Sequence, residues 1–156
     1  MNGSDSHALD WPRAIRRYLV ASLLVHPIWE ILQLPLYTIW REGSFGQIAF
    51  ATLHCTVGDV MIAGLSLLVA LALFGRPLWP HEGARAIWIT LLILGVGYTI
   101  WSEWLNVNVR RSWAYSELMP TLPVLGTGLG PLLQWVLVPT VVLYFVTGRG
   151  PWRALR

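Results

Sequence analysis

The chain has 156 residues, of which 55% are apolar and only 12% are charged, roughly half the charged share of a soluble domain. All eleven basic residues are arginine and the formal net charge is +3, which we expect to govern membrane topology and not nucleic-acid binding. A single cysteine, Cys55, excludes an internal disulfide and a paired-cysteine metal motif. The composition therefore predicts an integral membrane protein whose partners are membrane lipids.

Four apolar stretches are long enough to cross a bilayer, because a spanning helix needs about 20 residues. They cover residues 18–40, 48–74, 86–107 and 129–146. The segments between them are rich in turn residues and show no strand alternation. We predict an all-α fold, a bundle of four transmembrane helices in one domain over residues 18–147. A basic segment, 1–17, precedes the domain and a basic tail, 148–156, follows it.

The first apolar stretch contains Pro27 and Glu30 and has no small-residue cleavage site, so we interpret it as a retained helix and not as a signal peptide. Arginine placement predicts its orientation. Eight arginines fall on the side of the two termini and three on the other side, and an excess of this kind marks the cytoplasmic face. Both termini are therefore expected to be cytoplasmic, in the plasma (inner) membrane if the source is prokaryotic. The eight are Arg13, Arg16, Arg17, Arg76, Arg85, Arg149, Arg153 and Arg156; the three are Arg41, Arg110 and Arg111.

The first span carries polar side chains at helical spacing. His26, Glu30, Gln33 and Tyr37 lie at i, i+4, i+7 and i+11, which places them on one face. Ionisable groups within a bilayer cost several kcal/mol and normally face the bundle interior. This face is therefore expected to point toward the other three helices.

Two other spans repeat the pattern, and the fourth offers one amide, Gln134. Polar stripes on three helices predict a shared interior, with Glu30, Asp59 and Glu103 in a single pocket. Counting about 1.5 Å per residue places the polar groups in a funnel that opens to the non-cytoplasmic side, under the loop that contains Tyr115. The stripe residues are Thr52, Cys55, Thr56 and Asp59 with His54 beside them, and Thr99, Glu103 and Asn106 with Ser102 beside them.

The spacing of His26 and Glu30 suits either a proton relay or two ligands of a metal ion. Asp59 is expected to pair with His54 in the same way. The alternative is that these groups form interhelical hydrogen bonds and only hold the bundle together. A metal would draw its ligands from His26, Glu30, His54 and Asp59, and two histidines with carboxylates suit zinc or iron. The site is thus expected to need either no cofactor or a divalent metal.

Short motifs resemble those of the EXPERA membrane fold, the four-helix unit of the emopamil-binding sterol isomerases and their relatives. The motifs are "HPIWE" (26–30), "QLP" (33–35) and "QWVLVP" (134–139). The resemblance implies that His26 and Glu30 take the places of a His-x-x-x-Glu that protonates and deprotonates a sterol double bond. Trp135 and Pro139 match a Trp-x-x-x-Pro, whereas the asparagine expected three positions before that tryptophan is Leu132 here.

The third span, with Glu103, and the loop after it, with Tyr115 and a run of Gly and Pro residues, resemble carotenoid hydratases in general pattern. Both resemblances imply an isoprenoid-type substrate. We predict a small membrane enzyme, isomerase- or hydratase-like, that acts by acid–base chemistry on an isoprenoid or other lipid-like substrate. The expected catalytic residues are Glu30, Asp59, His26, His54 and Glu103, and the expected substrate-binding residues are Gln33, Asn106, Trp104, Tyr115, Gln134 and Trp135. The alternatives are a protein that translocates protons or metal ions, and a structural subunit of a membrane complex.

Overall fold

A computed structural model describes residues 10–148, which form an all-helical bundle without a strand element in that range. Four of its helical segments are long and apolar enough to cross a membrane: Trp11–Leu36, Phe45–Phe74, Ala84–Val109 and Leu129–Thr147. These segments establish the predicted four-helix architecture and support an integral membrane protein. The elements are α2 (Asp10–Gln33), η1 (Leu34–Leu36), α3 (Ile39–Glu42), α4 (Phe45–Phe74), α5 (Ala84–Glu103), the π-helical segment η2 (Trp104–Val109) and α6 (Leu129–Thr147).

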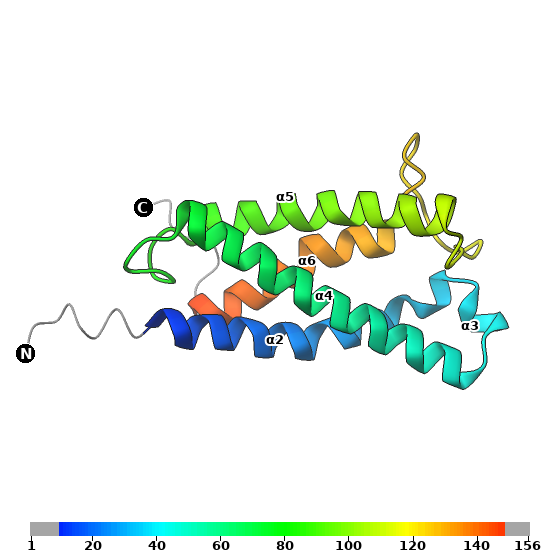
Figure 1. Cartoon of the computed structure of the whole chain (residues 1–156), viewed down its shortest axis with the longest axis horizontal. Helices are drawn as coiled ribbons and strands as arrows, with labels where there is room; N and C mark the ends of the chain where they lie inside the picture. The colour runs from blue at the N-terminus through cyan, green and yellow to red at the C-terminus, as the bar shows by residue number, and fades with distance from the viewer. Residues whose placement is uncertain (1–9, 149–156) are drawn as a thin grey trace, which may run out of the picture.

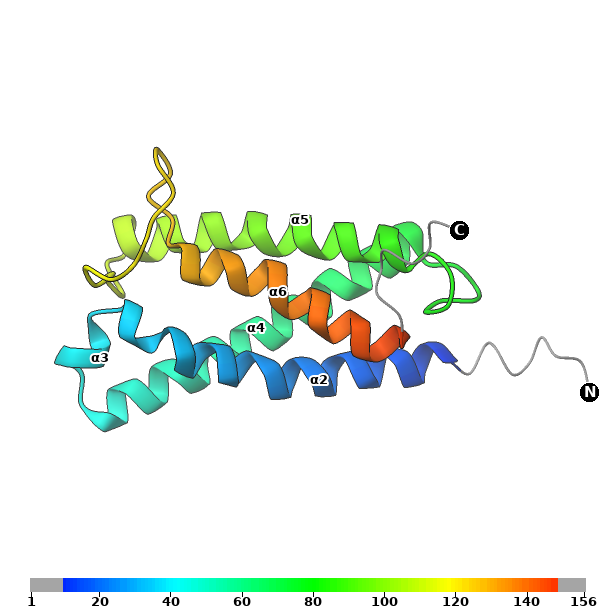
Figure 2. The same ribbon diagram turned by 180° about the vertical axis from the view of Figure 1, so that it is seen from behind.

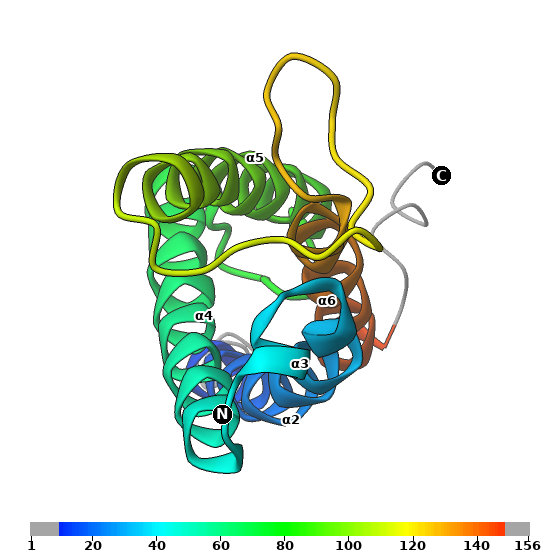
Figure 3. The same ribbon diagram turned by 90° about the vertical axis from the view of Figure 1, so that its right-hand side faces the viewer.

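The four long helices form a ring in which each packs against two neighbours. α2 and α5 lie on opposite sides, and both contact α4 and α6. Figures 1 and 2 show α4 crossing one face of the α2–α5 pair and α6 crossing the other. Seen end-on in Figure 3, the ring surrounds a central axis, and the loop 110–128 passes over one end of it. We call that end the cap end, and the end where α2 begins and α6 finishes the terminal end. Which membrane side each end faces stays a prediction.

Local sequence explains where the helices begin and end. α2 starts at Asp10, before the expected span, and stops being α-helical after Gln33 because Pro35 cannot donate a backbone hydrogen bond. Within the span expected to reach residue 40, a 3₁₀ turn followed by the short helix α3 therefore takes the place of the last turns. Ser44 caps α4 through a reciprocal arrangement with Gln47, in which each side chain bonds the other residue's backbone N–H.

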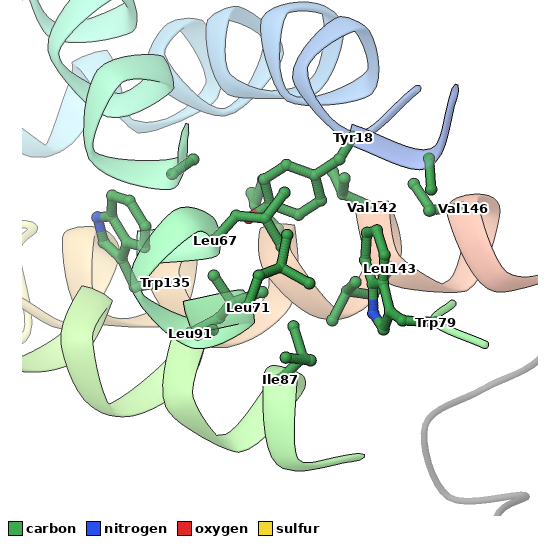
Figure 4. Packing of buried hydrophobic residues seen from close by; sticks show 14 residues of the cluster. Tyr18, Leu67, Leu71, Trp79, Ile87, Leu91, Trp135, Val142, Leu143 and Val146 are labelled. Carbon is green, nitrogen blue, oxygen red and sulfur yellow. The ribbon is translucent and has the colours of Figure 1, made fainter. Parts of the chain in front are cut away.

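The terminal half of the bundle is packed with apolar side chains. Figure 4 shows this apolar cluster, with Trp135 at one end and Trp79 and Val146 at the other. Trp135 packs tightly on α5, because a Cβ at Gly95 would come within 2.7 Å of its ring atom Cδ2. Only glycine leaves room for the indole there. The cluster comprises Ala14, Tyr18, Ala63, Leu67, Ala70, Leu71, Trp79, Ile87, Leu91, Trp135, Val138, Val142, Leu143 and Val146.

The outer faces of the helices are apolar as well. Leu24, Phe50, Leu73 and Phe145 are each more than 60% exposed. Contiguous apolar surface of this kind is rare on a soluble monomer and is what acyl chains would contact in a bilayer. The carboxylates of the spans, Glu30, Asp59 and Glu103, lie inside the ring, toward the cap end.

Candidate functional site

A cavity of about 330 Å³ lies between the four helices at the cap end. Glu30 of α2, Asp59 of α4 and Glu103 of α5 all line it, as the three polar stripes predict. Glu30 and Glu103 are each only 7% exposed, and Asp59 keeps 15% of its side-chain surface exposed. The carboxylates thus face a shared interior and are held away from the lipid-facing surface.

The amide of Gln134, on α6, is the centre of a polar cluster at the floor of this cavity. Its nitrogen Nε2 lies 2.7 Å from Oδ2 of Asp59, 3.0 Å from Nδ1 of His26 and 3.2 Å from Oε1 of Glu30. His26 also lies close to Asp59 directly, with 3.4 Å between Nδ1 and Oδ2. One side chain of α6 therefore gathers two residues of α2 and one of α4, and we name these four residues the floor cluster.

A tryptophan fixes which way the amides point. The indole Nε1 of Trp29 donates to Oε1 of Gln33 at 3.3 Å. Because an indole nitrogen can only donate, Gln33 must turn its own nitrogen toward Glu30, at 2.9 Å, and toward Oε1 of Gln134, at 3.4 Å. Gln134 then has to turn its NH₂ group toward the two carboxylates and His26.

The amide of Gln134 faces His26, with 3.0 Å between Nε2 and Nδ1. The two hydrogens of its NH₂ group have three acceptors within reach, so Nδ1 either accepts one of them or, in the other tautomer, donates to Asp59. His26 is only 1% exposed and does not line the cavity. Its ring packs against Trp135, with 5.6 Å between the ring centroids. The histidine is therefore a buried ring that contacts Asp59 from behind the cavity lining.

The loop at the cap end is attached to α5 and to the chain after α2. The hydroxyl of Tyr115 donates to the Glu103 carboxylate and accepts a hydrogen bond from the backbone N–H of Gly128 at 3.0 Å. Burial, followed by the hydrogen bond and charge of Glu103, raises the pKa of Tyr115 above its ordinary value. The phenol therefore stays protonated and remains a donor.

Backbone bonds hold the same loop to the end of α2. Thr38 N–H donates to Ala114 at 3.0 Å, and Ser116 N–H donates to Leu36 at 2.9 Å. The hydroxyl of Ser116 also donates to the Pro35 carbonyl at 3.0 Å. The segment 114–116 therefore forms a fixed cover over one side of the cavity, which is what the expected capping role of the loop requires.

An ion pair lies at the outside of this cover. Arg41 contacts Glu117 at 2.5 Å, and both side chains are more than half exposed. The local backbone N–H and the Arg41 guanidinium lower the pKa of Glu117. A pair this exposed is screened by water and contributes little to stability.

Two expected site residues do not make the contacts expected of them. His54 is exposed and stacks on Phe50 with 5.7 Å between ring centroids, so it lines the cavity wall but is not the partner expected for Asp59. The reason is rotation: five residues turn a helix by about 500°, which points the two side chains roughly 140° apart. Trp104 is 52% exposed and does not line the cavity, because it follows inward-facing Glu103 by one position.

The other expected residues reach the site. Gln33, Asn106, Gln134 and Trp135 line the cavity, and Tyr115 covers it through Glu103. Asn106 donates from Nδ2 to the backbone oxygen of Ser102 at 2.9 Å, which leaves its side-chain oxygen available.

A metal site is not formed by the described residues, among which no group of three or more His, Cys, Asp or Glu side chains is arranged to hold an ion. The geometry of the floor cluster explains why. His26, Glu30 and Asp59 converge on a point that the NH₂ group of Gln134 occupies, and an amide donor there excludes a cation from the same place.

Sequence reasoning gave no role in the site to Trp29 or Arg110. Trp29 stands next to Glu30 in an apolar run and had no feature to distinguish it from a lipid-facing residue. Arg110 lines the cavity, and its spacing after Glu103 and Asn106 continues their helical stripe by one further turn. That periodicity was the observation that could have identified it.

Comparisons of the chain with models of known protein families, with curated proteins and with solved structures found no significant match. The geometry of the cavity and of the floor cluster is therefore the basis for assigning a function.

Proposed function

We propose that the protein is a membrane enzyme that transfers protons to and from a lipid-like substrate, of isoprenoid type, held in the cap-end cavity. One observation carries the proposal. Glu30 and Asp59 line the floor of the cavity and are joined, with His26, through the amide of Gln134. Paired carboxylates at the end of a water-restricted pocket are suited to general acid–base catalysis.

The two carboxylates have different surroundings. Both contact the same nitrogen, so their contacting oxygens lie no more than about 6 Å apart. Two carboxylates this close in a low-dielectric interior favour sharing one proton between them. Glu30 accepts from Gln33 as well as from Gln134, whereas Asp59 has His26 beside it. The two environments therefore support different roles for the two carboxyl groups, one donating a proton to the substrate and the other accepting a proton from it.

These roles define a reaction. The protonated carboxyl group would donate to one carbon of a substrate double bond, and the other carboxylate would remove a proton from a neighbouring carbon, which moves the double bond. If a water molecule attacked the cation instead, and the second carboxylate took the proton that this water loses, the product would be the hydrated lipid. The face of Trp135, which lines the cavity, would stabilise the positive charge that develops on carbon. His26 would take up or return the proton at Asp59.

The packing of the terminal half supports an enzyme over a translocation pathway. Beyond Trp135 the ring is filled mainly by side chains of the apolar cluster, such as Leu67, Leu91 and Val138, and the buried hydroxyls of Ser22 and Ser66 there carry no charge. An ion crossing the membrane would need polar groups or water through this layer. A site accessible from one end suits a substrate that enters and leaves by the same route.

Deuterium incorporation tests the proposal although the substrate itself is unidentified. The purified protein is incubated in D₂O with a lipid extract of the membranes that contain it, exchangeable deuterium is washed out, and the lipids are analysed by mass spectrometry. Isomerisation and hydration both attach a solvent-derived deuterium to carbon. We expect one lipid class to gain deuterium with the wild-type protein and not with Glu30→Gln or Asp59→Asn.

A matched control is Glu117→Gln, which changes an exposed carboxylate outside the cavity and should incorporate deuterium like the wild type. The proposal is wrong if no lipid gains carbon-bound deuterium above the level of the Glu30→Gln sample while all variants keep their helical circular dichroism. That result would favour a purely structural role for the floor cluster.

A further inference from the structure

The rim of the cavity carries a cation without an internal partner. Arg110 is exposed and lines the cavity, and its guanidinium makes no hydrogen bond or ion pair with another residue in the range 10–148. Arg41, near the same end, is paired with Glu117. Arg111, the next residue, is also exposed but does not line the cavity. Of these three arginines, Arg110 alone faces the cavity with its donors unused.

Arg110 lies far from the floor cluster, at the other end of the cavity. Trp135, at the floor, packs against Gly95, and fifteen residues separate Gly95 from Arg110 along α5 and η2. At about 1.5 Å per residue this spans roughly 20 Å, shortened by the reach of the arginine side chain back into the cavity. The carboxylates of the floor cluster and the rim cation therefore lie at opposite ends.

The rim and the wall differ in chemistry. Ser112, two residues after Arg110, also lines the cavity, and a serine hydroxyl can donate to the same group. The rest of the lining includes the apolar side chains of Leu34, Ile62 and Tyr98, beside the polar side chains of Glu103 and Asn106. A ligand that binds the donors at the rim and also contacts the apolar side chains has a negatively charged oxygen group at one end and an apolar body behind it.

We propose that the substrate is a small amphipathic anion, with a carboxylate or phosphate head bound by Arg110 and Ser112 and an apolar chain directed toward Glu30 and Asp59. This inference rests on the proposed function and names the substrate class of the same cavity. Guanidinium groups bind both heads in the same forked geometry. The volume, about 330 Å³, is near the lower end for small-molecule sites and fits one chain and not the two chains of a phospholipid.

Binding of three radiolabelled probes tests the head group directly. Dodecanoate, dodecyl phosphate and neutral dodecanol share one chain and differ in the head, and each is measured by scintillation proximity on protein in a maltoside detergent. We expect Arg110→Gln to weaken binding of at least one anion about tenfold, the scale of one charge-assisted hydrogen bond, and to leave dodecanol unchanged. The anion whose affinity falls more in Arg110→Gln identifies the head group as carboxylate or phosphate.

The matched control is Arg111→Gln, which removes the same charge from the neighbouring residue and should bind all probes like the wild type. The inference is wrong if Arg110→Gln weakens the binding of dodecanol as much as that of the anions, or if Arg111→Gln weakens anion binding equally. It is also wrong if Arg110→Gln changes the affinity for no probe. The measurement is repeated in phosphatidylcholine nanodiscs. Loss of the Arg110 dependence there would assign the arginine to bilayer phosphate and would also overturn the inference.

The two proposals fail separately. Glu30→Gln lies at the other end of the cavity and should keep the Arg110-dependent binding of the anion, although it abolishes deuterium transfer. If deuterium is transferred but no anion binding depends on Arg110, the proposed anionic substrate is wrong and the proposed enzymatic function stands. If anion binding depends on Arg110 but no deuterium is transferred, the proposed acid–base function is wrong and the cavity is a site that binds anions.

Discussion

Replacing Gly95 by alanine tests the junction between the apolar cluster and the floor cluster. The added Cβ would overlap Cε3 of Trp135 and come within 2.7 Å of Cδ2 and 3.0 Å of Cζ3, whereas ordinary carbon contacts lie near 3.5–4.0 Å. The indole is 2% exposed, because Gly95, His26 and the apolar cluster enclose most of the ring. Overpacking of this kind costs typically 1–3 kcal/mol, and we take the upper end because a rigid ring cannot flex away.

The better helix propensity of alanine offsets about 1 kcal/mol of that cost, which leaves a net loss of about 2 kcal/mol. For a chain of this size 1 kcal/mol shifts the melting temperature by about 2–4 °C, so we expect Gly95→Ala to melt about 4–8 °C lower. Thermal unfolding followed by circular dichroism in detergent measures this. Gly97→Ala is the matched control, because a Cβ there meets nothing within 4 Å, and it should melt at or above the wild-type temperature. Equal melting of the two alanine variants would refute the tight packing of Trp135 on Gly95.

Two further predictions concern the cap end. Because the pKa of Tyr115 is raised, its phenol should bind its proton more tightly in the folded protein; the stability it contributes is complete below pH 10 and decreases as the pH rises toward the folded pKa. The ultraviolet difference between wild type and Tyr115→Phe should show no tyrosinate absorbance from this residue at pH 10.5, and its appearance there would mean that Tyr115 is not held by Glu103. Arg41→Gln should leave the melting temperature unchanged at both low and high salt, because its pair with Glu117 is exposed; a clear loss at low salt would show that this pair holds the loop in place.

Hydropathy and periodicity were sufficient to predict the four helices and the shared cavity. Each span contains far more apolar residues than a soluble helix, and a charged group in such a span has to face inward. Glu30, Asp59 and Glu103 therefore had one possible direction, and the structure places all three on one cavity. The break at Pro35 was less predictable, because prolines inside membrane helices are often tolerated, as Pro27 is in α2.

The partners within the site could not be predicted in the same way. How far one helix is rotated against its neighbours depends on packing across the bundle, such as the close contact of Trp135 with Gly95. That packing brings Asp59 to His26, whereas His54 lines the cavity wall and points roughly 140° away from Asp59 on the same helix. Gln134 is the only strongly polar residue of its span, so its sequence context gave no indication that three groups from two other helices would meet at its amide.

The proposed function depends on the amide of Gln134 binding the acid–base groups, and its energetic coupling to Asp59 tests this most directly. Wild type, Asp59→Leu, Gln134→Leu and the double variant are unfolded reversibly in mixed micelles, and the four free energies of unfolding give the coupling. With 2.7 Å between Oδ2 and Nε2, we predict a coupling above about 1 kcal/mol, near the upper end for polar pairs inside membrane proteins. Effects that add within about 0.5 kcal/mol, as those of distant residues do, would contradict the floor cluster and the function proposed from it.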